Sequence, residues 1–241
     1  MDYKGNYTVI GPPGTGKTTF LASRVERVAA SHPNRLLAGG PPALVCSLTK
    51  AAAAQAAGKN MTIPKEAVAT MHAHGWRAMD CPPLANVIVE EFNKDNPGLA
   101  ITASNAKVDD DIAGPQGDGS EPGDEYASEY HSLRHACVPK EKWGPEVSAW
   151  ARKWEAWKQE AGVVDFTDMI DLAPSTAPMD PAVVFVDEAQ DMSKLEFNKL
   201  REWGESAGAM VTVGDPYQAL YVWRGAQPQQ LLEDEDDPTR F

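Results

Sequence analysis

The stretch YTVIGPPGTGKTTFLAS, residues 7–23, joins a short apolar run to a helix-forming run through a glycine-rich loop. The loop, GPPGTGKTT (11–19), matches the pattern G-x-x-x-x-G-K-[ST]. Gly11, Gly14 and Gly16 let the backbone curl so that its N–H groups point at phosphate oxygens, and the helix start adds partial positive charge. The alternative is a chance glycine-rich turn, but the flanking strand and helix favour a phosphate-binding loop.

Two side chains of this loop carry the expected chemistry. Lys17 is expected to reach the β- and γ-phosphates of a nucleotide, and the Thr18 hydroxyl is expected to bind Mg²⁺. The sequence therefore predicts ATP as the nucleotide and Mg²⁺ as the metal. The loop residues expected around the nucleotide are Gly11, Pro13, Gly14, Thr15, Gly16, Lys17, Thr18 and Thr19.

A second motif, VVFVDEAQD (183–191), ends an apolar run in two consecutive carboxylates. Asp187 is placed to hold Mg²⁺ through water, and Glu188 to orient or deprotonate an attacking water. Alternatively, acidic residues at a strand end cap the next helix, and Asp191 or Ser193 would serve here. Because the chain already carries a phosphate loop, the carboxylate pair favours an ATPase-type site.

Five apolar runs predict the strands of one sheet: 7–11, 43–48, 67–71, 182–187 and 209–214. Near-continuous apolar runs are typical of parallel strands that are covered on both faces. Helical stretches alternate with them at 17–30, 49–58 and 193–207. The sequence therefore predicts an α/β fold, a mostly parallel sheet flanked by helices.

The alternation breaks between Asp80 and Gly162. We expect an ATPase core formed by 1–79 and 163–241, with 80–162 inserted as a partly helical accessory subdomain. Residues 104–125 are acidic and rich in glycine and proline, which predicts a mobile loop. In 144–162, apolar residues three or four apart form a helical stripe, which favours packing in a core over stacking on nucleic acid. The stripe consists of Val147, Trp150, Trp154 and Trp157.

The 241 residues carry a net charge of −13, with 42% hydrophobic residues. That charge argues against tight, salt-resistant DNA binding by this chain alone, although a local groove remains possible because exposed charges are screened in salt. No apolar run approaches the ~20 residues of a membrane span, and the N-terminus lacks a signal-peptide pattern. Cys46, Cys81 and Cys137 show no paired spacing. We therefore expect a cytoplasmic protein without a membrane partner.

Taken together, the motifs resemble those of superfamily 1 DNA helicases of the UvrD/Rep type. GPPGTGKTT, DEAQD and VGDPYQALYVWRGA resemble motifs I, II and III. LVCSLTKAAAAQ (44–55) resembles motif Ia, TMHAH (70–74) the T-x-H motif, and DFTDMI (165–170) the Asp-Phe-x-Asp motif before motif II. The resemblance implies the first, RecA-like ATPase domain of such a helicase and covers most of the chain outside the insertion.

On the nucleotide side, the resemblance implies catalytic roles for Lys17, Glu188 and Gln218, with Gln218 sensing the γ-phosphate. It also implies that Arg224 ties the turn of motif III to the acidic cluster around Glu188 or Gln190, next to the nucleotide.

On the DNA side, it implies that Tyr221 and Trp223 lie along a single-stranded DNA track, where stacking is worth about 1–3 kcal/mol per base. Both could instead be core residues, and His72 or His74 could be a packing histidine. Asp165 could simply cap a helix. The residues expected to approach the DNA are Thr49, Thr70, His72, Tyr221 and Trp223.

A grouping of His131, His135 and Cys137 could suggest a metal, but no fourth ligand is evident and we do not expect a site there. The MDYKGNYTVI segment holds no glutamine, which the resemblance would require upstream of motif I to recognise adenine. Base selectivity is therefore open.

The chain also ends before motifs IV to VI, which belong to a second RecA-like domain. We therefore expect half of a helicase motor: an ATPase stimulated by single-stranded DNA, acting in replication, repair or recombination. A second polypeptide, self-association or a longer parent chain would complete it. The alternatives are an RNA-directed superfamily 1 helicase fragment and a nucleotide-switched regulatory subunit.

Overall fold

The computed structural model describes residues 5–38, 40–48, 53, 58, 61–103, 121–220, 222 and 225–231. Their five strands form one sheet in which every pair is parallel, in the order β1-β5-β4-β2-β3. The predicted α/β fold with a parallel sheet is thus confirmed. The strands are β1 (Gly5–Ile10), β2 (Ala43–Ser47), β3 (Val68–Thr70), β4 (Val183–Val186) and β5 (Ala209–Gly214).

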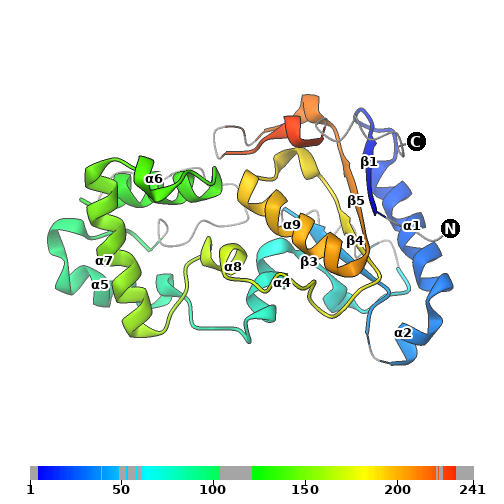
Figure 1. The fold of residues 1–241 in the computed structure, drawn as a ribbon, viewed down its shortest axis with the longest axis horizontal. Coiled ribbons are helices and arrows are strands. Elements are labelled where there is room, and N and C mark those ends of the chain that lie inside the picture. The colour runs from blue at the N-terminus through cyan, green and yellow to red at the C-terminus, as the bar shows by residue number, and fades with distance from the viewer. Residues whose placement is uncertain are drawn as a thin grey trace.

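Helices cover both faces of the sheet and extend beyond it to one side (Figure 1). The predicted helix at 49–58 lies mostly outside the described residues. The α-helices are α1 (Lys17–Ser31), α2 (Pro33–Leu37), α4 (Met71–Ala78), α5 (Val89–Asp95), α6 (Asp124–His135), α7 (Pro145–Ala161), α8 (Asp168–Asp171) and α9 (Lys194–Ala207). The short 3₁₀ helices are η1 (Lys65–Ala67), η2 (Ala85–Val87), η3 (Pro97–Leu99), η4 (Lys140–Lys142), η5 (Ala189–Asp191), η6 (Pro216–Gln218) and η8 (Pro228–Leu231).

The strands divide their side chains between two cores according to residue parity. Odd-numbered residues of β2, β4 and β5, such as Val45 and Phe185, pack against α1 in one cluster. Even-numbered residues, such as Leu44 and Val184, pack against α9 in the other. Successive side chains of a strand point to opposite faces, so a strand that is buried on both faces must be apolar throughout. This explains why the runs in the sequence are continuous.

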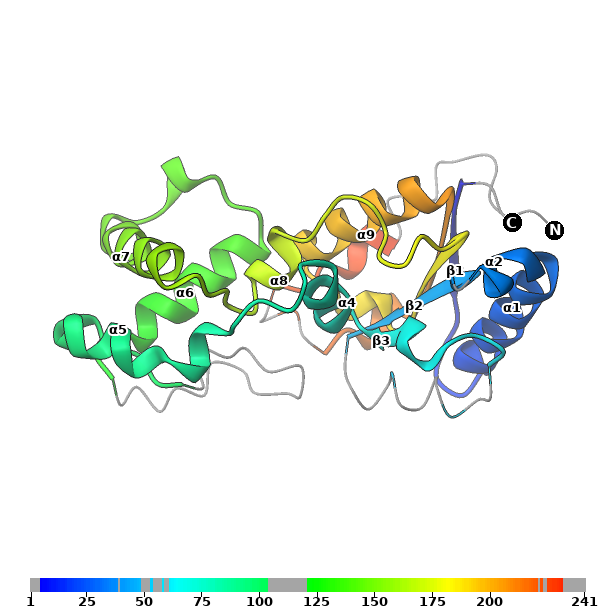
Figure 2. The same cartoon turned by 90° about the horizontal axis from the view of Figure 1, so that it is seen from below.

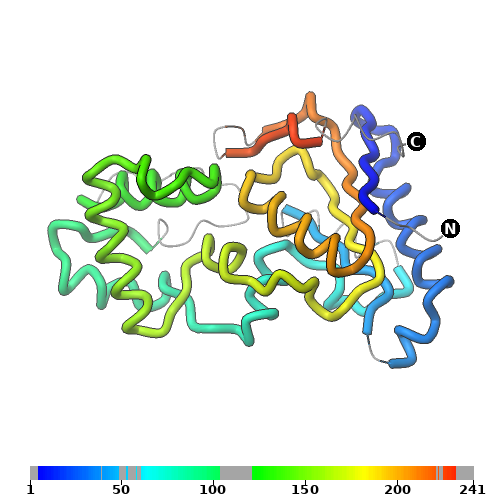
Figure 3. Tube along the Cα trace, in the orientation of Figure 1, coloured from blue at the N-terminus to red at the C-terminus, as the bar shows by residue number. Residues whose placement is uncertain are grey.

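The helices α5, α6 and α7 form a third apolar cluster beside the sheet domain (Figure 2). The chain leaves the sheet domain after α4 and returns before α8 (Figure 3). Trp150 and Trp154 of α7 are buried in this cluster, 1% and 0% exposed, which confirms the predicted core role of the stripe. They pack against Phe92 and Tyr130, from α5 and α6, rather than against the sheet.

The division into a core and an inserted subdomain at 80–162 stays a prediction. Of the predicted acidic loop 104–125, residues 104–120 lie outside the described residues, and α6 begins at Asp124. None of the helices within the described ranges combines the length and the apolar character that crossing a membrane requires.

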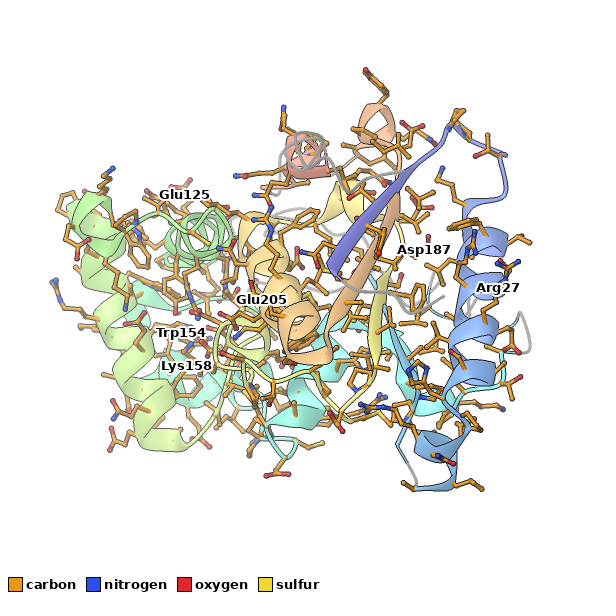
Figure 4. All side chains as sticks on the ribbon, turned by 45° about the vertical axis from the view of Figure 1, so that its right-hand side comes forward. Arg27, Glu125, Trp154, Lys158, Asp187 and Glu205 are labelled. Atoms are coloured by element: carbon orange, nitrogen blue, oxygen red, sulfur yellow. The ribbon has the colours of Figure 1, made fainter. Side chains whose placement is uncertain are left out.

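Buried charges join the third cluster to the segment that returns to the sheet. Lys158 of α7 forms ion pairs with Asp165 and Asp168, and Arg134 of α6 lies 2.8 Å from Asp168. Trp154 and Lys158 both project from α7 toward the interior of the molecule (Figure 4). Burial opposes ionisation of Asp165, but the positive charges around it, led by Lys158, outweigh that effect and hold its pKa well below the ordinary value.

Candidate nucleotide-hydrolysis site

The glycine-rich loop connects the end of β1 to the start of α1 at the carboxyl edge of the sheet, where ligands bind in open parallel sheets. Gly14 and Gly16 have φ angles of 74° and 82°, which side chains other than glycine rarely adopt, and a Cβ on either would meet open space. At Gly11 a Cβ would lie 2.8 Å from the Thr15 hydroxyl oxygen. The loop from Pro12 to Gly16 is exposed, so a ligand can reach it.

Lys17 opens α1 and folds back over this loop. Its Nζ donates hydrogen bonds to the carbonyl oxygens of Gly11 at 2.9 Å and Pro12 at 3.4 Å. The first turn of α1 contains no acidic residue, and its N-terminus has no side-chain cap. An ammonium group and uncapped backbone N–H groups together make a positive environment that fits phosphate oxygens.

Thr18 and Asp187 meet at the same edge. The Thr18 hydroxyl donates to Oδ2 of Asp187 at 3.2 Å, and Asp187 lies at the end of β4, between the sheet and α1 (Figure 4). Burial, and then the negative charge of Glu188, raise the pKa of Asp187 above its ordinary value. A hydroxyl and a buried carboxylate are oxygen donors of the kind that Mg²⁺ prefers, so these residues fit the ion.

Glu188 follows directly and adopts the left-handed conformation, with φ 53° and ψ 42°. This backbone conformation is uncommon for a residue with a side chain and costs about 1–3 kcal/mol, so the surrounding structure must hold it. Glu188 is partly exposed as a residue, and its Oε2 accepts a hydrogen bond from Nε2 of Gln190 at 2.7 Å.

Strand β5 lies between β1 and β4, so its end separates the loop from the acidic pair. Gly11 N donates to the Gly214 carbonyl oxygen at 3.2 Å. Asp215 follows Gly214, and its carboxylate accepts hydrogen bonds from Tyr217 N at 3.1 Å and from Nε2 of Gln218. The structure therefore brings Gln218 to the same edge as Asp187 and Glu188, while its γ-phosphate role stays a prediction.

The residues predicted to contact DNA fall into two groups. Thr70 is buried and caps α4 by accepting a hydrogen bond from Ala73 N at 3.2 Å, and His72 is buried against Phe166, with ring centroids 5.9 Å apart. Both hold structural positions, and direct DNA contact stays a prediction. Thr49, Tyr221, Trp223 and Arg224 lie outside the described residues.

Other polar residues singled out in the sequence bond to helix starts or to buried hydroxyl groups. Asp165 Oδ1 accepts a hydrogen bond at 2.9 Å from the N–H of Asp168, the first residue of α8, whose N-cap position is held by Thr167. Ser193 caps α9 in a capping box with Glu196. His131 contacts Thr167 at 2.7 Å and His135 contacts Ser193 at 2.9 Å. Both histidines are therefore engaged by hydroxyl groups in the seam between α6 and the sheet domain.

Sequence reasoning missed Asp215. The expected place of Gln190 beside the nucleotide stays a prediction; the side chain is buried, and both ends of its amide contact protein groups. Asp215 organises the start of motif III, and its position after a glycine at a strand end was the available signal. Asp191 likewise accepts from Leu220 N at 2.8 Å, which ties motif II to motif III.

Comparison with known proteins agrees with this geometry. A family model described as an AAA domain matches residues 3–224. DNA helicase II of Escherichia coli is 27% identical over 100 residues, covering 36% of this chain and 14% of that protein. DNA helicase II of Haemophilus influenzae is 28% identical over 81 residues, covering 30% of this chain and 11% of that protein. The match therefore spans only a small part of each helicase. The chain belongs to the AAA domain family, and this family match, the similarity to DNA helicase II and the all-parallel sheet together support an ATPase domain of the helicase kind.

Proposed function

We propose that this chain hydrolyses ATP in a Mg²⁺-dependent reaction that single-stranded DNA stimulates. One observation carries the proposal: the exposed glycine loop and the acidic pair meet at one edge of the sheet, where Thr18 contacts Asp187 at 3.2 Å. Lys17 binds the phosphates, and Thr18 and Asp187 hold the ion. Bound Mg²⁺ would neutralise charge that develops on the phosphate oxygens.

Glu188 acts on the attacking water. Glu188 is a partly exposed residue next to Asp187, so its carboxylate can accept a proton as the water oxygen attacks the γ-phosphorus. The bond between the γ-phosphorus and the β–γ bridging oxygen breaks, which yields ADP and inorganic phosphate. Gln218 donates a hydrogen bond to Asp215 and contacts the γ-phosphate. It thereby couples the presence of the γ-phosphate to the conformation of the segment that follows it.

Support for DNA binding comes from that following segment. Tyr217, Leu220 and Val222 are 93%, 72% and 58% exposed, so this part of motif III faces solvent at the edge of the site. We propose that it contacts single-stranded DNA together with Tyr221 and Trp223. Movement along DNA requires a second ATPase-type domain that opens and closes against this one, supplied by a partner polypeptide, a second copy or further residues of a longer chain.

Turnover measurements on the purified chain test this proposal. We expect slow ATP hydrolysis that rises with single-stranded DNA, and we expect Lys17→Ala to abolish hydrolysis. Trp223→Ala should keep basal hydrolysis and lose stimulation by single-stranded DNA.

Measuring ATP turnover with single-stranded RNA in place of DNA tests the alternative of an RNA-directed helicase, which RNA would stimulate more strongly than DNA. A nucleotide switch, acting on a partner in DNA processing, would show turnover that DNA leaves unchanged. Wild-type turnover in Lys17→Ala would contradict the assigned site.

A further inference from the structure

We propose that Gln190 is a positioning residue for hydrolysis. It holds the carboxylate of Glu188 by tying it to the backbone of Asp215, at the end of the neighbouring strand β5. The inference rests on the function proposed above, because it assumes that Glu188 acts on the attacking water. Gln190 itself need not touch the nucleotide.

All the hydrogen-bonding groups of the Gln190 amide contact the protein. Its Oε1 accepts from Asp215 N at 3.0 Å, and its Nε2 donates to Oε2 of Glu188 at 2.7 Å and to Oδ2 of Asp191 at 3.3 Å. The side chain is buried, with 3% of its surface exposed. A fully paired amide in a buried position has one stable orientation, so it can fix its neighbours.

The chemistry of these partners requires glutamine at this position. A backbone N–H only donates, so an oxygen must face Asp215 N, and two carboxylates only accept, so the NH₂ group must face Glu188 and Asp191. Glutamate would place a third carboxylate against the other two. Leucine would leave the buried N–H of Asp215 without this acceptor.

The Gln190 amide is also linked, through Asp215, to Gln218, the residue proposed to contact the γ-phosphate. Asp215, whose N–H is held by Gln190, accepts from Gln218 through its carboxylate. At Gly214 a Cβ would lie 2.6 Å from Oε1 of Gln190, so the close approach of the two strand ends depends on a residue without a side chain. Gln190 therefore sets the spacing between the loop that carries Glu188 and the loop that carries Gln218.

Kinetics of two variants test the inference on the full chain. In Gln190→Leu we expect kcat to fall by roughly ten- to a hundredfold, since a hydrogen bond to a charged group is lost. In Gln190→Glu, which has nearly the native shape, we expect a fall at least as large. The dissociation constant of an uncleavable triphosphate should change by less than about threefold in both variants. The reason is that Gln190 acts on the chemical step through Glu188 and does not take part in nucleotide binding.

The control is Gln230→Leu, which removes another buried amide, in η8, that bonds Gln227 rather than the acidic pair. Its kcat should equal that of the wild type, and its melting temperature should fall as much as that of Gln190→Leu. If Gln190→Leu does not fold, Gln190→Glu decides. A kcat unchanged in Gln190→Glu, or lost equally in Gln230→Leu, overturns the inference.

A double-mutant cycle separates this inference from the proposed function. Glu188→Gln should abolish steady-state turnover, and adding Gln190→Leu should change the residual single-turnover rate by less than about twofold, because coupled residues are not additive. If Glu188→Gln keeps wild-type turnover, the role given to Glu188 and the inference both fail, whereas the proposed function itself fails only if the wild-type chain hydrolyses no ATP. If Glu188→Gln loses turnover while Gln190→Leu and Gln190→Glu keep it, only the inference fails.

Discussion

The Thr18 hydroxyl donates a hydrogen bond to the Asp187 carboxylate at 3.2 Å, although 169 residues separate the two along the chain. The contact joins the first turn of α1 to the end of β4. Because β5 lies between β1 and β4, the loops that follow β1 and β4 face each other across its carboxyl end. That arrangement brings a hydroxyl, a carboxylate and an ammonium to one edge of the sheet.

Removing either partner of this contact should weaken the use of Mg²⁺. In Thr18→Val and Asp187→Asn we expect the Mg²⁺ concentration for half-maximal ATP turnover to rise by about ten- to a hundredfold, since oxygen donors near the ion are lost. Titration of turnover with Mg²⁺ measures the shift. Ser23→Ala, one turn further along α1 with a hydroxyl bonded to the Phe20 carbonyl oxygen, serves as the control. An unchanged Mg²⁺ dependence in Asp187→Asn would remove Asp187 from the metal site.

Lys158 holds two buried carboxylates, so its loss should destabilise the fold. In Lys158→Met, Asp165 stays buried with Arg134 as a weaker partner at 3.5 Å, and we expect a loss of about 3–5 kcal/mol in the free energy of unfolding. Urea denaturation gives that value. Lys153→Met, on the exposed side of α7, should change stability by less than about 0.5 kcal/mol. Equal effects of the two substitutions would mean that the buried pairs contribute nothing.

Gly75 marks a close contact between α4 and α8. A Cβ there would lie 2.0 Å from the Met169 carbonyl oxygen, so Gly75→Ala must push the two helices apart. We expect a loss of about 1–3 kcal/mol of stability from this overpacking. Gly98→Ala places its Cβ in open space and should stay within about 0.5 kcal/mol of the wild type. Thermal and urea unfolding of both variants check the contrast, and a native-like Gly75→Ala would contradict it.

His74 should make stability depend on pH. It is buried on α4, where its Nε2 donates to the Val45 carbonyl oxygen at 3.1 Å, and burial lowers its pKa from 6.5 to about 4. Because the unfolded chain then binds the proton first, this contribution to stability is complete above about pH 6.5 and falls as the pH drops toward 4.

Between pH 7 and pH 5 the expected loss from His74 is about 2 kcal/mol. His74→Gln keeps a donor but has no titrating group, so its unfolding free energy should fall less over that range than the wild-type value does. His131, whose pKa burial lowers to about 3, adds a loss of the same sign to both proteins. Parallel pH profiles for the wild type and His74→Gln would refute this contribution.

Much of the fold was predictable because its signals are local. Each predicted strand overlaps an observed one, since residues such as Val184 and Phe185 are buried on opposite faces and both must be apolar. The Trp150 and Trp154 stripe predicted a buried helix face but not its partners. Those partners, Phe92 and Tyr130, come from segments 58 and 20 residues before Trp150, and helical periodicity carries no information about them.

The sequence by itself determined the parallel sheet, the phosphate loop and the acidic pair, because strand burial and glycine conformation are decided within a few residues. Only the tertiary structure decided what Gln190, Thr70 and His72 contact. Gln190 bonds the N–H of Asp215, 25 residues away, because β4 and β5 end side by side. Hydrogen bonds between loops depend on which strands are neighbours, and strand order is set by packing of the whole sheet rather than by any one segment.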